Sequence, residues 1–120
     1  VLIVDDAKAN LDILVEGLKA DHKLSLAMNG EMALQIAART PPDLVLLDIM
    51  MPFMDGYEVC GALKKDPELA GIQVLFLTGK DANDDAGQSF KSGADLFIKK
   101  PFSCERLLEM VRMVLISVSR

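Results

Sequence analysis

Residues 44–48 read Leu-Val-Leu-Leu-Asp, four aliphatic residues followed by an acid. A short apolar run without polar alternation is typical of a strand buried on both faces, as in a parallel sheet with helices on each side. Residues 1–4 have the same character and lead into Asp5 and Asp6. Further apolar runs lie at residues 74–77 and 96–98, and residues 24–27, Leu-Ser-Leu-Ala, are mostly apolar. The sequence therefore predicts five strands of one parallel sheet.

Segments of helical period separate these runs. Apolar residues recur at three- and four-residue spacing in residues 11–18, in residues 32–37 and after Gly56, and a weaker helical pattern covers residues 84–91. The residues expected to face inward in the second of these helices are Met32, Ala33, Ile36 and Ala37. A last helix is expected to begin near Ser103, a residue type that favours the N-cap position.

The last predicted helix has one clear apolar stripe. The residues of this stripe, which should face the sheet, are Leu107, Met110, Val111, Val114, Leu115 and Val118. Met113 and Ile116 should then project to the opposite side, among charged residues. Two apolar residues on a charged outer face suggest a contact surface. An equally good interpretation of Ile116 is that it lies in the frayed end of the helix, or in a linker, and not in a contact surface.

Five strands alternating with five helices within 120 residues predict a single α/β domain with helices on both faces of the sheet. Right-handed crossover connections restrict such a chain to few topologies. The flavodoxin-like, doubly wound strand order 2-1-3-4-5 is the one expected at this size. Because Val1 already lies inside an apolar run, we expect the domain, residues 1–120, to be a segment of a longer protein.

Composition excludes several classes of protein. The chain is 51% hydrophobic and 26% charged, which argues against disorder. The net charge of −5 disfavours contact with phosphate backbones, so no nucleic-acid partner is expected for this domain. The apolar runs fall far short of the about 20 residues of a membrane span, and no signal peptide is visible. Cys60 and Cys104 are too far apart in the sequence for the spacing of metal ligands, and they are expected to be thiols in a reducing compartment. The chain has a single histidine, His22, which argues against a Ser–His–Asp triad.

The carboxyl ends of parallel strands meet at one edge of the sheet, where ligands bind. The sequence places Asp5, Asp6, Asp48, Thr78 and Lys100 at these ends. Three clustered carboxylates repel one another, and a bound Mg²⁺ relieves the repulsion because it accepts carboxylate oxygens and keeps waters for its other positions. A carboxylate can also attack phosphorus, and a cation and a lysine neutralise the transferred oxygens. This set of residues fits Mg²⁺-dependent phosphorylation of one aspartate.

The ordered set of an acid pair, a lone Asp, a Thr and a Lys-Pro resembles the receiver domain of two-component response regulators, including chemotaxis regulators, over the whole chain. The loop at residues 48–56, Asp-Ile-Met-Met-Pro-Phe-Met-Asp-Gly, is also similar to this family. The resemblance implies that Asp48 accepts the phosphoryl group. It implies that Asp6, Asp48 and the backbone carbonyl of Met50 bind Mg²⁺, and that Asp5 acts mainly through a metal-bound water.

The resemblance also implies further roles and partners. Thr78 would bind the incoming phosphoryl group, Lys100 would pair with it, and Phe97 would be the switch aromatic. An aromatic residue in a last strand is also a common packing residue, so Phe97 has two interpretations. The phosphoryl donor would be a histidine kinase or phosphotransfer protein, and the face of the fourth helix, fifth strand and fifth helix would bind an output domain, a partner protein or a second copy. Such a domain would be cytoplasmic, and it would not be an enzyme beyond its own phosphorylation and self-dephosphorylation. The self-dephosphorylation is expected to be slow, because Met50, two residues after the acceptor, cannot hydrogen-bond an attacking water through its side chain.

Three other functions share parts of this pattern. A degenerate receiver, used as a constitutive interaction module, is expected to lose the acceptor or the acid pair, and both are present here. A haloacid dehalogenase-like phosphatase has a second Asp two residues after its nucleophile, where this chain has Met50. A flavodoxin-type carrier needs a loop that cradles phosphate, and Asp-Asp-Ala-Lys at residues 5–8 lacks that character. The degenerate receiver is kept as the alternative.

Overall fold

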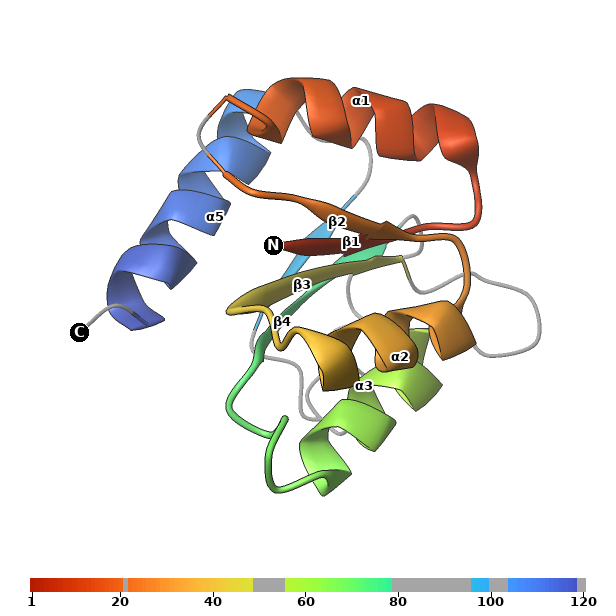
Figure 1. The fold of residues 1–120 in the computed structure, drawn as a ribbon. Coiled ribbons are helices and arrows are strands. Elements are labelled where there is room, and N and C mark those ends of the chain that lie inside the picture. The colour runs from red at the N-terminus through yellow and green to blue at the C-terminus, as the bar shows by residue number, and fades with distance from the viewer. Residues whose placement is uncertain (21, 49–55, 79–95, 100–103, 119–120) are drawn as a thin grey trace.

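A parallel five-stranded sheet forms the centre of the protein, in the order β2-β1-β3-β4-β5 (Figure 1). The computed structural model describes all residues except 21, 49–55, 79–95, 100–103 and 119–120. The strands are β1 (Leu2–Val4), β2 (Ser25–Ala27), β3 (Leu44–Asp48), β4 (Gln73–Thr78) and β5 (Leu96–Lys99). The helices are α1 (Lys8–Leu18), α2 (Gly30–Arg39), α3 (Gly56–Lys65) and α5 (Cys104–Val118). The predicted strand order is confirmed, and the helix predicted at residues 84–91 lies outside the described residues.

Helices cover both faces of the sheet, α1 and α5 on one face and α2 and α3 on the other (Figure 1). Because successive strand residues point to opposite faces, the strands β1, β3, β4 and β5 each contribute side chains to two hydrophobic clusters, one under each pair of helices. In β1, Leu2 and Val4 belong to the cluster under α2 and α3, and Ile3 belongs to the cluster under α1 and α5. All three side chains are buried, as their unbroken apolar run predicts.

Strand β3 lies in the middle of the sheet, between β1 and β4. Val45 and Leu47 face one cluster, while Leu44 and Leu46 face the other, and all four are fully buried. A central strand covered on both faces has no exposed side, which explains why this segment is apolar until its last residue, Asp48.

Helix α2 corrects one expectation from the sequence. Met32 was expected to face inward but is 42% exposed, and the buried residues of α2 are Gly30, Ala33 and Ala37. These three follow the three- and four-residue spacing of one helix face, and Met32 lies about 100° away from Ala33 around the axis. The prediction for Met32 is wrong because the helix turns its smallest residues toward the sheet, which allows the helix to approach closely.

Helix α5 packs as its apolar stripe predicts. Leu107, Val111 and Val114 are buried against the cluster under α1 and α5, with Met110 and Leu115 partly buried beside them. Met113 and Ile116 are exposed on the outer side of the helix. The side chain of Val118 and the proposed N-cap Ser103 lie outside the described residues.

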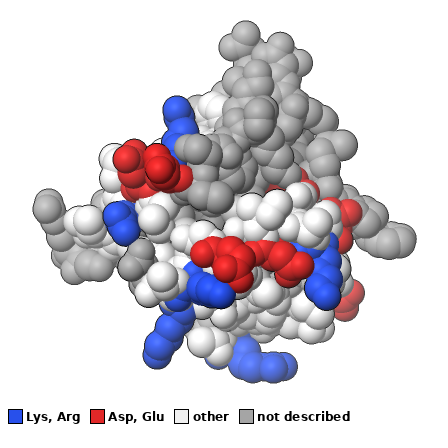
Figure 2. Space-filling model, turned by 90° about the horizontal axis from the view of Figure 1, so that it is seen from above, with Lys and Arg blue, Asp and Glu red and all other residues white. Residues whose placement is uncertain are grey.

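Other features of the described residues bear on the sequence-based expectations. Cys60 on α3 is buried, and the side chain of Cys104 is not among those described. Among the described helices, none is both long and apolar enough to cross a membrane. The face covered by α1 carries acidic and basic side chains next to each other (Figure 2). Glu16 and Lys19 form an exposed ion pair with a distance of 2.9 Å between carboxylate and ammonium.

Candidate functional site

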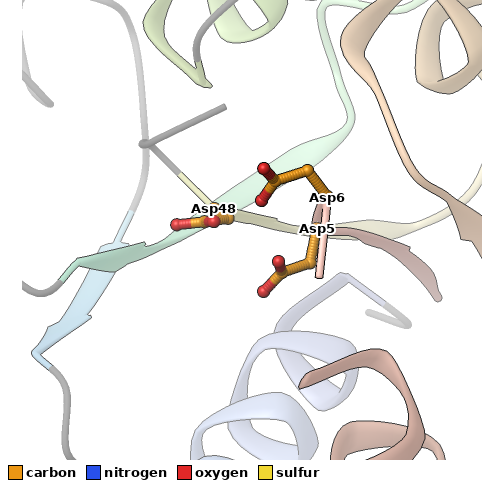
Figure 3. Close-up of side chains that lie close together, drawn as sticks. All are labelled: Asp5, Asp6 and Asp48. Atoms are coloured by element: carbon orange, nitrogen blue, oxygen red, sulfur yellow. The ribbon is translucent and has the colours of Figure 1, made fainter. Parts of the chain in front are cut away.

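Three carboxylates meet at the carboxyl edge of the sheet (Figure 3). Asp5 and Asp6 directly follow β1, and Asp48 is the last residue of β3. Val4 pairs with Leu47 in the β1–β3 ladder, so the next position brings Asp5 beside Asp48. One carboxylate oxygen of each aspartate lies within 4.8 Å of those of the other two. One cation placed between them can therefore interact with all three.

Asp5 is held in place by hydrogen bonds from the start of α1. The backbone N–H of Ala7 donates to its Oδ1 at 2.9 Å, and the Nδ2 of Asn10 donates to its Oδ2 at 3.2 Å. The backbone N–H of Asp5 donates to the carbonyl of Ala27 at 3.1 Å, which extends the β1–β2 pairing. With these bonds, Asp5 is 0% exposed. Both of its carboxylate oxygens accept hydrogen bonds from the protein.

Asp6 and Asp48 have different surroundings from Asp5. The side chain of Asp6 is exposed, and it projects to a different side of the chain from that of Asp5 (Figure 3). Asp48 ends the central strand and is only 6% exposed. The cluster thus combines one exposed carboxylate with two that the fold buries. All three donors are hard oxygen ligands, which suit Mg²⁺ rather than a thiophilic metal.

Strands β4 and β5 reach the same edge. Leu77 is the ladder partner of Asp48, so Thr78, the last residue of β4, lies one position further toward the carboxyl edge. Thr78 pairs with Lys99 on β5. The structure therefore brings the three aspartates together and places the backbone of Thr78 at their edge of the sheet. Met50 and Lys100, which are also predicted site residues, lie outside the described residues.

Phe97, the predicted switch aromatic, lies in β5 opposite Phe76 of β4. Its side chain is half-buried and packs against the cluster under α2 and α3. The packing interpretation of Phe97 is thus confirmed, and its role as a switch stays a prediction.

Asn10 is not among the residues that we predicted for the site. The signal was present, because a polar residue at the third position of a helix often folds its side chain back toward the residues before the helix. Ala7, at the N-cap of α1, makes no side-chain hydrogen bond. The polar contacts at this helix start come instead from Asp5 and Asn10.

The sheet is flavodoxin-like, and three carboxylates lie together at the ends of its first and third strands. A domain with this arrangement is suited to bind a divalent cation beside a reactive aspartate. The family model for the response regulator receiver domain matches residues 1–112, and the chain belongs to this family. It is a receiver domain with a phosphoacceptor role in two-component signalling. Receiver domains bind Mg²⁺ at an acidic pocket and interact with histidine kinases and output domains.

Individual relatives agree with the family. The chain is 44% identical to the response regulator PleD of Caulobacter vibrioides over 93% of its own length, and 42% identical to a probable cyclic di-GMP phosphodiesterase of Vibrio cholerae over 92%. It covers only 25% of the length of each of these two proteins. Among solved structures, the signal receiver domain of a histidine kinase from Syntrophus aciditrophicus superposes with a TM-score of 0.91 at 36% identity, with 99% of this chain and 91% of that chain covered.

Proposed function

We propose that Asp48 accepts the phosphoryl group, in a reaction that needs Mg²⁺ bound by Asp6, Asp48 and the backbone carbonyl of Met50. Asp5 would contribute through a metal-bound water. The observation that supports this most directly is the approach of the three carboxylates to within 4.8 Å of one another. Such a cluster is electrostatically costly without a cation, and a bound Mg²⁺ would supply the charge that makes one of its carboxylates approachable by a phosphate.

In the proposed reaction, a carboxylate oxygen of Asp48 attacks the phosphorus of a phosphohistidine on a histidine kinase or phosphotransfer protein. The new O–P bond forms as the N–P bond breaks, and the histidine nitrogen keeps the electron pair. Thr78 and Lys100, at the ends of β4 and β5, would contact the transferred oxygens. Phosphoryl transfer depends mainly on positioning and charge neutralisation, so these few groups suffice. The domain would therefore promote only its own phosphorylation and slow self-dephosphorylation.

The acceptor assignment is tested by labelling with acetyl phosphate and Mg²⁺, followed by intact-mass measurement and peptide mapping. We expect one added phosphoryl group on Asp48 and none in Asp48→Asn. Asp43→Asn is the matched control, because Asp43 is an exposed acid just before the same strand. Undiminished labelling of Asp48→Asn contradicts the assignment, and an unlabelled wild-type chain supports the degenerate receiver instead.

We also propose that the output surface includes β5 and α5, together with the helix predicted at residues 84–91. Met113 is 70% exposed on α5, and Ile116 is exposed one turn later. The charged residues Arg106, Glu109 and Arg112 are exposed on the same helix. An apolar pair surrounded by charges suits a contact that forms and breaks. Phosphorylation would alter this surface through Phe97, and the partner would be an output domain, another protein or a second copy of the chain.

The remaining proposals concern the whole protein. Residues 1–120 would be one receiver domain of a longer chain, in keeping with the 25% of PleD that they cover. A cytoplasmic location is also proposed, because it is typical of the receiver domain family to which the chain belongs.

A further inference from the structure

We propose that Asn10 is a positioning residue of the metal site, which sets the Mg²⁺ affinity of the acidic cluster by holding the carboxylate of Asp5. The inference rests on the proposed Mg²⁺ site. Its basis is the hydrogen bond of 3.2 Å from the Nδ2 of Asn10 to the Oδ2 of Asp5, between a partly buried residue of α1 and a fully buried acid.

Two donors from α1 fix the plane of this carboxylate. A carboxylate group rotates easily when only one oxygen is held, but here Ala7 holds Oδ1 while Asn10 holds Oδ2. A carboxylate has about four acceptor positions, so two hydrogen bonds do not by themselves saturate it. Such a carboxylate can also accept a hydrogen bond from a metal-bound water. Outer-shell partners of this kind orient the groups around a metal and tune its affinity.

The neutral amide of Asn10 suits this task better than a charged group. A lysine or arginine at the same position would place a positive charge next to Asp5 and compete with the cation. An aspartate would add another negative charge and offer no hydrogen to Asp5. An amide donates one hydrogen bond and leaves the net charge of the cluster unchanged, so it orients Asp5 without weakening the attraction for Mg²⁺.

Asn29 provides a matched control, because it plays only a capping role. Its side chain accepts a hydrogen bond of 2.7 Å from the backbone N–H of Met32 and so caps α2. Both asparagines lie at helix starts that follow strands of the same sheet, β1 for Asn10 and β2 for Asn29. They differ in that Asn10 bonds to a carboxylate of the cluster. If Asn10 only stabilised its helix, Asn10→Ala would behave like Asn29→Ala.

The test compares wild type, Asn10→Ala and Asn29→Ala by calorimetric Mg²⁺ titration and by thermal unfolding without metal. We expect Asn10→Ala to raise the Mg²⁺ dissociation constant about tenfold, the lower range for loss of an outer-shell partner. Asn29→Ala should lower the unfolding temperature and leave the dissociation constant unchanged. Asn10→Leu, which keeps the number and branching of the side-chain heavy atoms but lacks the donor, should weaken binding as Asn10→Ala does.

A spectroscopic readout adds a second criterion. The amide proton of Ala7 donates to Asp5, so its NMR shift reports on that carboxylate directly. In metal-free Asn10→Ala, the chemical shift of this proton should differ from that in metal-free wild type. During a Mg²⁺ titration, the shift should change at higher Mg²⁺ concentrations in Asn10→Ala than in wild type. An unchanged dissociation constant in both Asn10 variants overturns the inference even if they unfold at lower temperature.

Failure of the proposed function gives a different result. If wild type binds Mg²⁺, Asp6→Ala does not, and Asn10→Ala matches wild type, then only the role of Asn10 is overturned. If wild type shows neither Mg²⁺ binding nor acetyl phosphate labelling, the proposed metal site fails and the role of Asn10 fails with it.

Discussion

The ring of Tyr57 on α3 meets the ring of Phe76 on β4 edge-on, with ring centres 5.2 Å apart and planes inclined by 68°. Phe76 pairs with Phe97 on β5, and Tyr57 and Phe97 both pack, partly buried, against the cluster that contains Phe76. Thr78 follows Phe76 by two residues on the same strand. Aromatic side chains therefore connect the strand that ends at the proposed phosphoryl site with both α3 and β5.

This contact makes Tyr57 a reporter of activation. The chain has one tyrosine and no tryptophan, so its intrinsic emission arises from Tyr57. If Phe97 changes position on activation, the packing around Phe76 changes with it. We expect beryllofluoride with Mg²⁺ to alter the tyrosine emission of wild type and to leave that of Asp48→Asn unchanged. Constant emission in wild type, while fluorine NMR shows beryllofluoride bound, would exclude coupling through these rings.

The roles of Asp5 and Asp6 should separate in thermal unfolding. Asp6 is exposed, so Asp6→Ala should relieve repulsion, keep the stability without metal, and abolish the stabilisation by Mg²⁺. In wild type that stabilisation is about 2.7 kcal/mol when Mg²⁺ is at 100 times its dissociation constant. Asp5→Ala should instead lower the stability without metal by about 1–3 kcal/mol, because the donors of Ala7 and Asn10 lose their acceptor.

The control for this comparison is Asp12→Asn, which removes an exposed acid from α1 outside the cluster. It should keep the full response to Mg²⁺. An equal gain in unfolding temperature with Mg²⁺ in wild type and Asp6→Ala would show that Asp6 is no ligand.

Self-association through α5 is tested by sedimentation with and without beryllofluoride. We expect activated wild type to form dimers and Met113→Glu to weaken them, because the substitution places a charge in the apolar part of the contact. Ile13→Glu is the matched control, since Ile13 is 58% exposed on a different helix, α1. A chain that stays monomeric when activated argues against self-association, and equal effects of the two substitutions argue against this face.

Global stability should depend on the central strand and hardly on the outer face of α5. Leu46 is fully buried in β3, and Leu46→Ala should lower the free energy of unfolding by about 2–5 kcal/mol through lost burial and a cavity. Met113→Ala should change it by no more than about 0.5 kcal/mol. Urea denaturation measures both values, and a Leu46→Ala cost below that of Met113→Ala would contradict the described core.

Much of the fold could be predicted from the sequence because the sheet is parallel and covered on both faces. Such strands are apolar along their whole length, so the segments containing Ile3 and Leu46 stand out without an alternating pattern. The inward face of a short helix is harder to predict. In α2, either the apolar Met32 or the small Ala33 could face the sheet. Close packing of the helix on the sheet favours the smaller side chain, so Ala33 is buried and Met32 is exposed.

The position of the acids followed from the sequence alone, since residues directly after parallel strands must gather at one edge of the sheet. Only the tertiary structure decided their individual roles. Asp5 is buried and accepts a hydrogen bond at each carboxylate oxygen, whereas Asp6 is exposed. One of the two donors to Asp5 is the side chain of Asn10, on the helix that follows. The positions of the strands are encoded in local apolar runs, which short sequence windows reveal. A hydrogen bond such as that from Asn10 depends on the angle at which α1 leaves β1, and packing of the whole helix on the sheet sets that angle.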